Sequence, residues 1–136
     1  MKLKELMVDT KSAWMEFPGL PGFEVELVNL SRKELTQLRK RCVTTKFDRA
    51  TRQPVETVNE ERFVEEFANS VIKNWKGLKL KYLEDLLLVD IKDNDPEAEL
   101  DYSQENAVTL ITGSAEFDTW VNDAVFDLEN FRTKSD

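Results

Sequence analysis

The chain has 136 residues, of which 40% are apolar and 34% are charged. That length suits one ordinary domain burying about two-thirds of its unfolded surface, and eight Phe and three Trp supply core material, which excludes wholesale disorder. Histidine is absent and Cys42 is the single cysteine, so catalytic triads, Cys-His pairs, His or multi-Cys zinc clusters and an internal disulfide are excluded. These absences exclude most familiar enzyme chemistry, and we expect no cofactor. Acid–base catalysis by a pair of carboxylates stays formally possible, but the sequence gives no sign of it.

The formal net charge of −8 is unevenly distributed along the chain. Residues 1–81 hold 16 Lys and Arg against 12 Asp and Glu, whereas residues 82–136 hold 3 against 15. An acidic chain is unsuited to broad binding of nucleic acid or of anionic membranes. The split suits docking onto protein partners or head-to-tail self-association as a homo-oligomer, and solvated charge that only maintains solubility is an equally weighted alternative.

The expected location is the cytoplasm. No apolar run approaches the ~20 residues that a membrane helix needs, and the start MKLKELMVD lacks the apolar region of a signal peptide. A single cysteine also fits a reducing compartment. We expect no membrane contact.

The first predicted element is a β-hairpin over residues 13–30. Apolar residues alternate with glutamates from Phe23 to Leu27, after a loop of about five residues that is rich in Pro and Gly. An isolated hairpin is marginally stable in water, so it must lie on something else. Three aromatic residues, Trp14, Phe17 and Phe23, are candidates for contact with a partner, because a hairpin does not readily bury both faces. Packing onto helices of the same chain is the alternative.

A helix is predicted to begin at Ser31. Ser31 and Glu34 form a capping box, and apolar residues at Leu35, Leu38 and Cys42 share one face. We expect Cys42 to be a small core residue and not a reactive thiol. Residues 44–58 have no helical period and contain a proline, so we predict a loop there, with short extended pieces as an option.

The next segment predicts a helix over residues 59–75. Asn59 is its N-cap, apolar residues recur every four positions up to Trp75, and Gly77 suits the left-handed residue that closes it. Residues 78–91 fit either a short helix or a buried strand, and we favour the helix. Residues 90–101 form an acidic linker whose carboxylates do not match a calcium loop, because Ala98 occupies the position that needs Gly.

Two capped helices are predicted to end the chain. Ser103 caps a helix through residue 112, and Ser114 caps one that runs to residue 131. The predicted fold class is α+β and mainly helical: an N-terminal β-hairpin at 13–30 is followed by four or five helices packed as one domain. That single domain spans 1–136, with a helical body at 31–131 and a frayed tail at 132–136.

Nucleotide binding has no support, since neither GxGxxG nor GxxxxGK[ST] occurs. One local basic cluster is interpreted as a solvated surface or a protein-docking patch. Its members are Arg39, Lys40, Arg41, Lys46, Arg49 and Arg52.

A helix ending in VIKNWKGL leads through an acidic interval to YSQENAVTLI and then to a closing helix with FDTWV and NF. The notable positions are Trp75, Lys76, Gly77 and Leu78, then Tyr102, Ser103, Glu105 and Asn106, then Phe117, Trp120 and Phe131. In these motifs and their order, the chain resembles the tail assembly chaperones of long-tailed bacteriophages.

The resemblance implies a small phage protein that binds the tape measure protein, keeps it soluble and helps recruit the tail tube protein. It also implies that the protein is not an enzyme, that it acts in the host cell cytoplasm and that it is absent from the mature virion. Without ATP chemistry, such a chaperone shields apolar stripes by binding alone. The candidate contact residues are Trp14, Phe17, Phe23, Trp75 and Tyr82. For Trp75, closure of its helix onto the core is the alternative.

Two other functions stay open at this point. A structural tail or connector protein would share the small size and the acidity but would be retained in the virion. An acidic DNA-mimic inhibitor would use the negative C-terminal half to occupy the basic groove of a nucleic-acid-binding partner.

Overall fold

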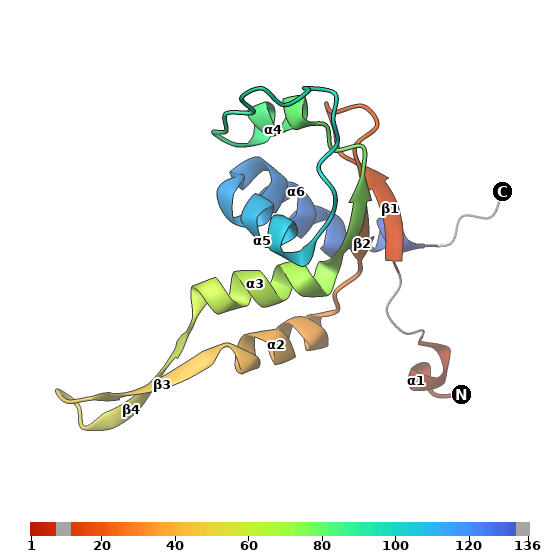
Figure 1. The fold of residues 1–136 in the computed structure, drawn as a ribbon. Coiled ribbons are helices and arrows are strands. Elements are labelled where there is room, and N and C mark those ends of the chain that lie inside the picture. The colour runs from red at the N-terminus through yellow and green to blue at the C-terminus, as the bar shows by residue number, and fades with distance from the viewer. Residues whose placement is uncertain (8–11, 133–136) are drawn as a thin grey trace.

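The computed structural model describes residues 1–7 and 12–132, and Figure 1 shows their arrangement. The predicted frayed tail at 132–136 lies outside the described residues from position 133 onward. The elements in chain order are α1 (Leu3–Leu6), β1 (Ser12–Glu16), β2 (Glu24–Val28), α2 (Arg32–Arg41), β3 (Val43–Asp48), β4 (Gln53–Val58), α3 (Glu60–Val71), β5 (Ile72–Lys76), α4 (Leu80–Leu86), α5 (Gln104–Gly113), α6 (Ala115–Phe126) and the 3-10 helix η1 (Leu128–Phe131).

The predicted N-terminal hairpin is present as β1 and β2. The two strands pair antiparallel, from Ser12 opposite Val28 to Glu16 opposite Glu24. The Phe17 amide donates to the Phe23 carbonyl at 2.9 Å, which closes a loop over residues 18–22. The hairpin becomes the first two strands of a three-stranded sheet with the order β1-β2-β5.

The third strand of this sheet shows that the prediction of one helix over 59–75 is wrong. Helix α3 ends at Val71, and β5 pairs antiparallel with β2, where Leu27 lies opposite Ile72 and Val25 opposite Trp75. The register shifts between these two pairs, and this bulge lets Ile72 and Trp75 both face the core although they are three residues apart. The apolar spacing of four residues that predicts a helix up to Trp75 therefore continues from helix α3 into the bulged strand β5.

The segment predicted as a loop at 44–58 is a second antiparallel hairpin. Strands β3 and β4 pair from Val43 opposite Val58 to Asp48 opposite Gln53. Nearly all of its residues are exposed, so it lacks the apolar alternation that marks a half-buried strand. The mainly helical fold class is thus wrong in its description of the body: three strands lie between α2 and α4, and the described residues form an α+β fold with two sheets.

Helices α2, α5 and α6 begin directly after the serine residues that were predicted as their N-caps. The hydroxyls of Ser31, Ser103 and Ser114 accept from the amides of residues 34, 106 and 117, at 3.1, 3.0 and 3.2 Å. Helix α4 agrees with the helix favoured for 78–91. The last predicted helix is too long, because α6 ends at Phe126 and η1 follows. No helix in the described parts of the chain has the length and apolar character of a membrane span.

The core lies between the three-stranded sheet and helices α3, α5 and α6 (Figure 1). Phe23 of the hairpin and Phe117 of α6 are fully buried, and their rings stack with centroids 6.3 Å apart. Burying an aromatic side chain contributes roughly 1.5–3 kcal/mol through the hydrophobic effect. This contact fixes α6 against the sheet and so positions the surface described below.

Gly77 turns the chain out of β5 in a left-handed conformation, with φ of +73°. A Cβ at this position would lie 1.9 Å from the carbonyl oxygen of Gly22 in the hairpin loop. Gly19 is also left-handed, with φ of +86°, but a Cβ there would meet nothing within 4 Å. Both positions favour glycine for backbone reasons, and Gly77 alone of the two is also crowded.

Gly77→Ala is therefore expected to destabilise the fold more than Gly19→Ala. Left-handed strain costs each variant about 1–2 kcal/mol, and overpacking against Gly22 adds about 1–3 kcal/mol for Gly77→Ala. Urea unfolding of both variants and the wild type measures the difference. Equal losses in the two variants would contradict the close approach of Gly77 to Gly22.

Candidate protein-binding surfaces

The five predicted contact residues do not form one surface. Phe17, Phe23 and Trp75 are buried, with exposures of 2%, 0% and 5%. Trp75 lies where the alternative placed it, in the core, and its indole Nε1 donates to the Leu100 carbonyl at 2.9 Å. Phe23 and Trp75 therefore have no free face to offer to a partner in this conformation.

Trp14 is the exposed member of the set, at 42%. It lies opposite Glu26 on the side of the sheet that faces away from the core. The Lys76 ammonium lies 4.9 Å from the centroid of its ring and 3.2 Å from the carboxylate of Glu24. The surroundings of Trp14 are charged and polar, so it is an isolated aromatic side chain rather than part of an apolar patch.

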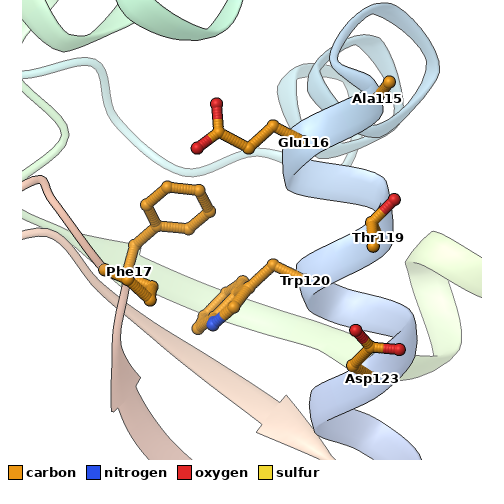
Figure 2. Close-up of a pocket in the computed structure, with 7 residues that line it drawn as sticks. Phe17, Ala115, Glu116, Thr119, Trp120 and Asp123 are labelled. Carbon is orange, nitrogen blue, oxygen red and sulfur yellow. The ribbon is translucent and has the colours of Figure 1, made fainter.

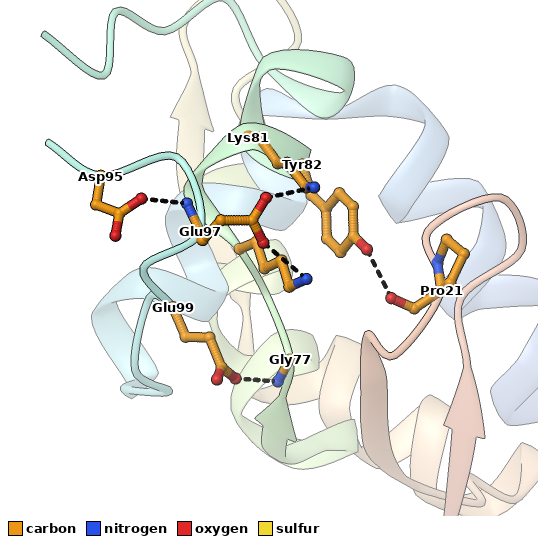
Figure 3. A network of polar contacts seen from close by, with 8 residues as sticks. Pro21, Gly77, Lys81, Tyr82, Asp95, Glu97 and Glu99 are labelled. Atoms are coloured by element: carbon orange, nitrogen blue, oxygen red, sulfur yellow. Dashed lines mark hydrogen bonds and ion pairs between the residues drawn. The ribbon is translucent and has the colours of Figure 1, made fainter.

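Tyr82 joins α4 to the loop of the N-terminal hairpin (Figure 3). Its hydroxyl donates to the Pro21 carbonyl at 2.6 Å. The acidic stretch folds back onto the same region, because the Glu99 carboxylate accepts from the Gly77 amide at 2.7 Å. Tyr82 and the acidic stretch thus hold this end of the fold together. Within residues 1–7 and 12–132, no group of three potential ligands is placed to hold a metal ion.

Glu97 carries two lysines in this polar network. Its carboxylate lies 2.6 Å from Lys81 Nζ and 2.9 Å from Lys79 Nζ. The hydrogen bond from Lys81, followed by that from Lys79, lowers the pKa of Glu97 from 4.5 to about 2. A lowered pKa means that the folded state favours the carboxylate. The resulting stabilisation is present above pH 4.5 and is lost as the pH falls toward 2.

The Glu97 carboxyl is therefore expected to titrate with a midpoint near 2. Lys81→Met, which removes the stronger hydrogen bond, should raise that midpoint toward the ordinary value of 4.5, and Lys79→Met should raise it less. Carbon-detected NMR titration of the side-chain carboxyl measures all three. A wild-type midpoint near 4.5 would show that the two lysines do not hold Glu97 in solution.

A groove lies between the hairpin loop and α6, and Figure 2 shows it from close by. We call it the groove throughout; its volume is about 470 Å³. Its lining residues are Phe17, Pro18, Ala115, Glu116, Thr119, Trp120 and Asp123. The α6 members recur at spacings of three and four residues, which places them on one face of the helix.

The floor of the groove is aromatic and well supported. The rings of Phe17 and Trp120 meet edge to face with centroids 5.0 Å apart, and both also pack on Phe117. Since Phe117 is fully buried, the floor is anchored in the core. The groove is therefore preformed, and binding there needs little ordering of its walls.

The rim of the groove is acidic. Glu116 and Asp123 are exposed and lie on the same side of α6 as Trp120 (Figure 2). Among the residues that the structure describes, no cation forms an ion pair with either carboxylate. An apolar floor beneath two free carboxylates suits an apolar side chain carried by a segment with Lys or Arg.

The second surface is the hairpin of residues 43–58, which we call the arm. It extends away from the body beyond the ends of α2 and α3 (Figure 1). Phe47 is 66% exposed and Val55 is 40% exposed. Lys46, Arg49 and Arg52 are exposed as well, and no carboxylate in residues 12–132 pairs with them.

The base of the arm is fixed to the body. The Asn59 amide donates to the Cys42 carbonyl at 2.7 Å, and the Cys42 thiol donates to Glu66 at 3.4 Å. Burial, and then this hydrogen bond, raises the pKa of Cys42, which keeps the thiol protonated. Arg41 also pairs with Glu66 at 3.4 Å. Part of the basic cluster is thus structural, whereas its members on the arm face solvent.

The structure brings one of the five predicted residues, Phe17, into the groove. Trp120 reaches the groove from the FDTWV motif, whereas Glu116, Asp123 and Phe47 were not predicted as contact residues. The spacing of Glu116, Trp120 and Asp123 on one helical face is a pattern that can reveal an acidic rim beside an aromatic residue. No pattern in the neighbouring sequence indicates that Phe17 would lie against Trp120 in the groove.

A family model described as YdaY prophage protein matches residues 28–136. The matched range includes the arm and the α6 side of the groove, and it begins at the end of β2. Searches of curated proteins and of solved structures found no match.

Proposed function

This chain belongs to the YdaY prophage protein family, and on that premise we propose that it is a phage tail assembly chaperone. In this role it binds the tape measure protein, keeps it soluble and helps recruit the tail tube protein. The membership supports a phage-related function. The chaperone role is the finer proposal and draws on the arrangement of the groove.

The groove is the observation that carries the proposal. An amphipathic helix can lay an apolar side chain on the floor that Phe17 and Trp120 form, while its basic residues meet Glu116 and Asp123. A tape measure helix presents long apolar stripes that aggregate when they are left uncovered. Many weak contacts of this kind along one long partner would shield it and still release it during assembly.

A role in binding, with no chemical step, agrees with the character of this surface. Glu116 and Asp123 are exposed at the rim. Their place above an aromatic floor suits steering and recognition of a basic segment.

The motifs behind the resemblance to tail assembly chaperones occupy defined places in the fold. The WKGL motif covers the end of β5 and the corner that follows, where Trp75 enters the core and Gly77 meets the hairpin loop. Ser103 caps α5, and Trp120 forms half of the groove floor. The FDTWV motif thus connects the resemblance to the proposed binding surface.

Co-expression with the tape measure protein of the same prophage tests this proposal. The wild-type chain should raise the soluble fraction of the tape measure protein severalfold and should co-purify with it. Glu116→Lys/Asp123→Lys should reduce the co-purified amount by about tenfold, because charge reversal repels basic segments. The soluble fraction and pull-down yield are measured by quantitative gel analysis.

The matched control for this experiment is Glu84→Lys/Asp85→Lys. It makes the same change in net charge at two exposed residues of α4 that do not line the groove, and it should bind like the wild type. A tape measure protein whose solubility is unchanged by the wild-type chain would contradict the chaperone role. Mass spectrometry that finds the chain retained in purified phage particles would favour a structural tail protein instead.

A further inference from the structure

We infer that the groove also accepts the arm of a second copy, so that the chain self-associates head to tail. The inference goes beyond the proposed function and does not rest on it, because it concerns the purified chain alone. It starts from the chemistry of the two surfaces. The groove offers an aromatic floor and free carboxylates, and the arm offers an exposed aromatic residue and free cations.

The outer end of the arm presents its apolar and basic groups together. Phe47 lies directly opposite Pro54 on the neighbouring strand, so the two share one face of the hairpin. Arg49 follows Phe47 in the turn, whereas Lys46 alternates onto the opposite face of the hairpin together with Val55. Over residues 46–54 three cations accompany one carboxylate, that of Asp48, which already accepts from the Ala50 amide at 2.9 Å.

The groove has the dimensions and charge to receive this end. Its volume of about 470 Å³ lies within the range that is typical of ligand-binding pockets in proteins. The Phe47 ring would pack on the half-buried ring of Trp120, which Phe17 supports edge to face from below. Arg49, in the turn beside Phe47, would then lie near the carboxylates at the rim.

The contact has to form between copies. The arm leaves the body past α2 and α3, whereas the groove lies between α6 and the hairpin loop, and the paired strands keep the arm extended (Figure 1). The hydrogen bond between Asn59 and Cys42 also holds its base in place. An arm that cannot fold back onto its own groove remains free for the groove of another copy.

The two surfaces differ, so the contact is heterologous. Each bound copy still offers one free arm or one free groove, and such contacts grow into chains unless the rotation closes a ring. An interface limited to one hairpin end is small, so the association should be weak and should depend on protein concentration. Salt screens the charges and should weaken it.

Sedimentation velocity of the purified full chain at low and high salt tests the inference. The average mass should rise with concentration at low salt and fall on addition of salt. An arm variant, Phe47→Ser/Arg49→Ser, and a groove variant, Glu116→Lys/Asp123→Lys, should each bind themselves at least about tenfold more weakly. Mixed together, they should form a 1:1 dimer, because one intact arm and one intact groove remain.

Matched controls separate this result from a general effect of charge or of apolar area. Leu88→Ser/Lys33→Ser removes one exposed apolar and one basic side chain outside the arm, and Glu84→Lys/Asp85→Lys reverses two acids outside the groove. Both should associate like the wild type. Thermal melting checks that every variant folds, and none of the changed side chains is buried.

A wild-type chain that stays monomeric throughout would overturn the inference. So would self-association that survives in both the arm and groove variants, or a mixture of the two that does not form a dimer. The arm variant keeps an intact groove, so its capture of the tape measure protein is a separate measurement. If the wild-type chain fails to capture the tape measure protein but still self-associates, the proposed function is overturned and the inference of self-association stands.

Discussion

The fold depends on the pairing of β2 along both of its edges. Val25 and Leu27 are fully buried, so the amides and carbonyls of this central strand need partners within the sheet. One partner, β1, is local and is delivered by a short loop. The other, β5, follows α2, the arm and α3 in the sequence. It completes the sheet, which packs against α3, α5 and α6.

The groove is a consequence of that arrangement. Once the sheet is formed, Phe23 stacks on Phe117 and sets the position of α6 relative to the hairpin loop. Phe17, immediately before that loop, then meets Trp120 about one turn further along α6. Residues separated by about a hundred positions thus build one aromatic floor, and the carboxylates beside it follow from helical spacing alone.

The arm differs from the body in how it is stabilised. Its residues bury little apolar surface, so it relies on its own hydrogen-bond ladder and on the fixed ends of α2 and α3. An exposed two-stranded unit with Phe47 uncovered gains stability when another surface covers it. If the arm and a tape measure segment both use the groove, they compete for it, and binding of the partner would release self-associated copies.

The local elements of this protein were largely determined by its sequence. Each N-cap side chain accepts a hydrogen bond from the amide three residues later, as seen for Ser31, Asn59, Ser103 and Ser114. The Pro- and Gly-rich loop specifies the first hairpin. Cys42 was expected in the core and is buried there. Such features depend on neighbours in the chain, so their patterns can be interpreted without a tertiary structure.

The tertiary structure alone decided the strand β5, the arm and the groove. The spacing of Phe67, Val71 and Trp75 is equally compatible with a continuing helix and with a helix followed by a bulged strand. The choice depends on the open edge of β2, nearly fifty residues earlier. The arm lacks a buried face that would impose alternation, and the groove joins Phe17 to Trp120 across the whole fold. Contacts between distant residues depend on which strand edges and apolar faces still lack a partner after the local structure has formed. A pattern of neighbouring residues does not contain that information.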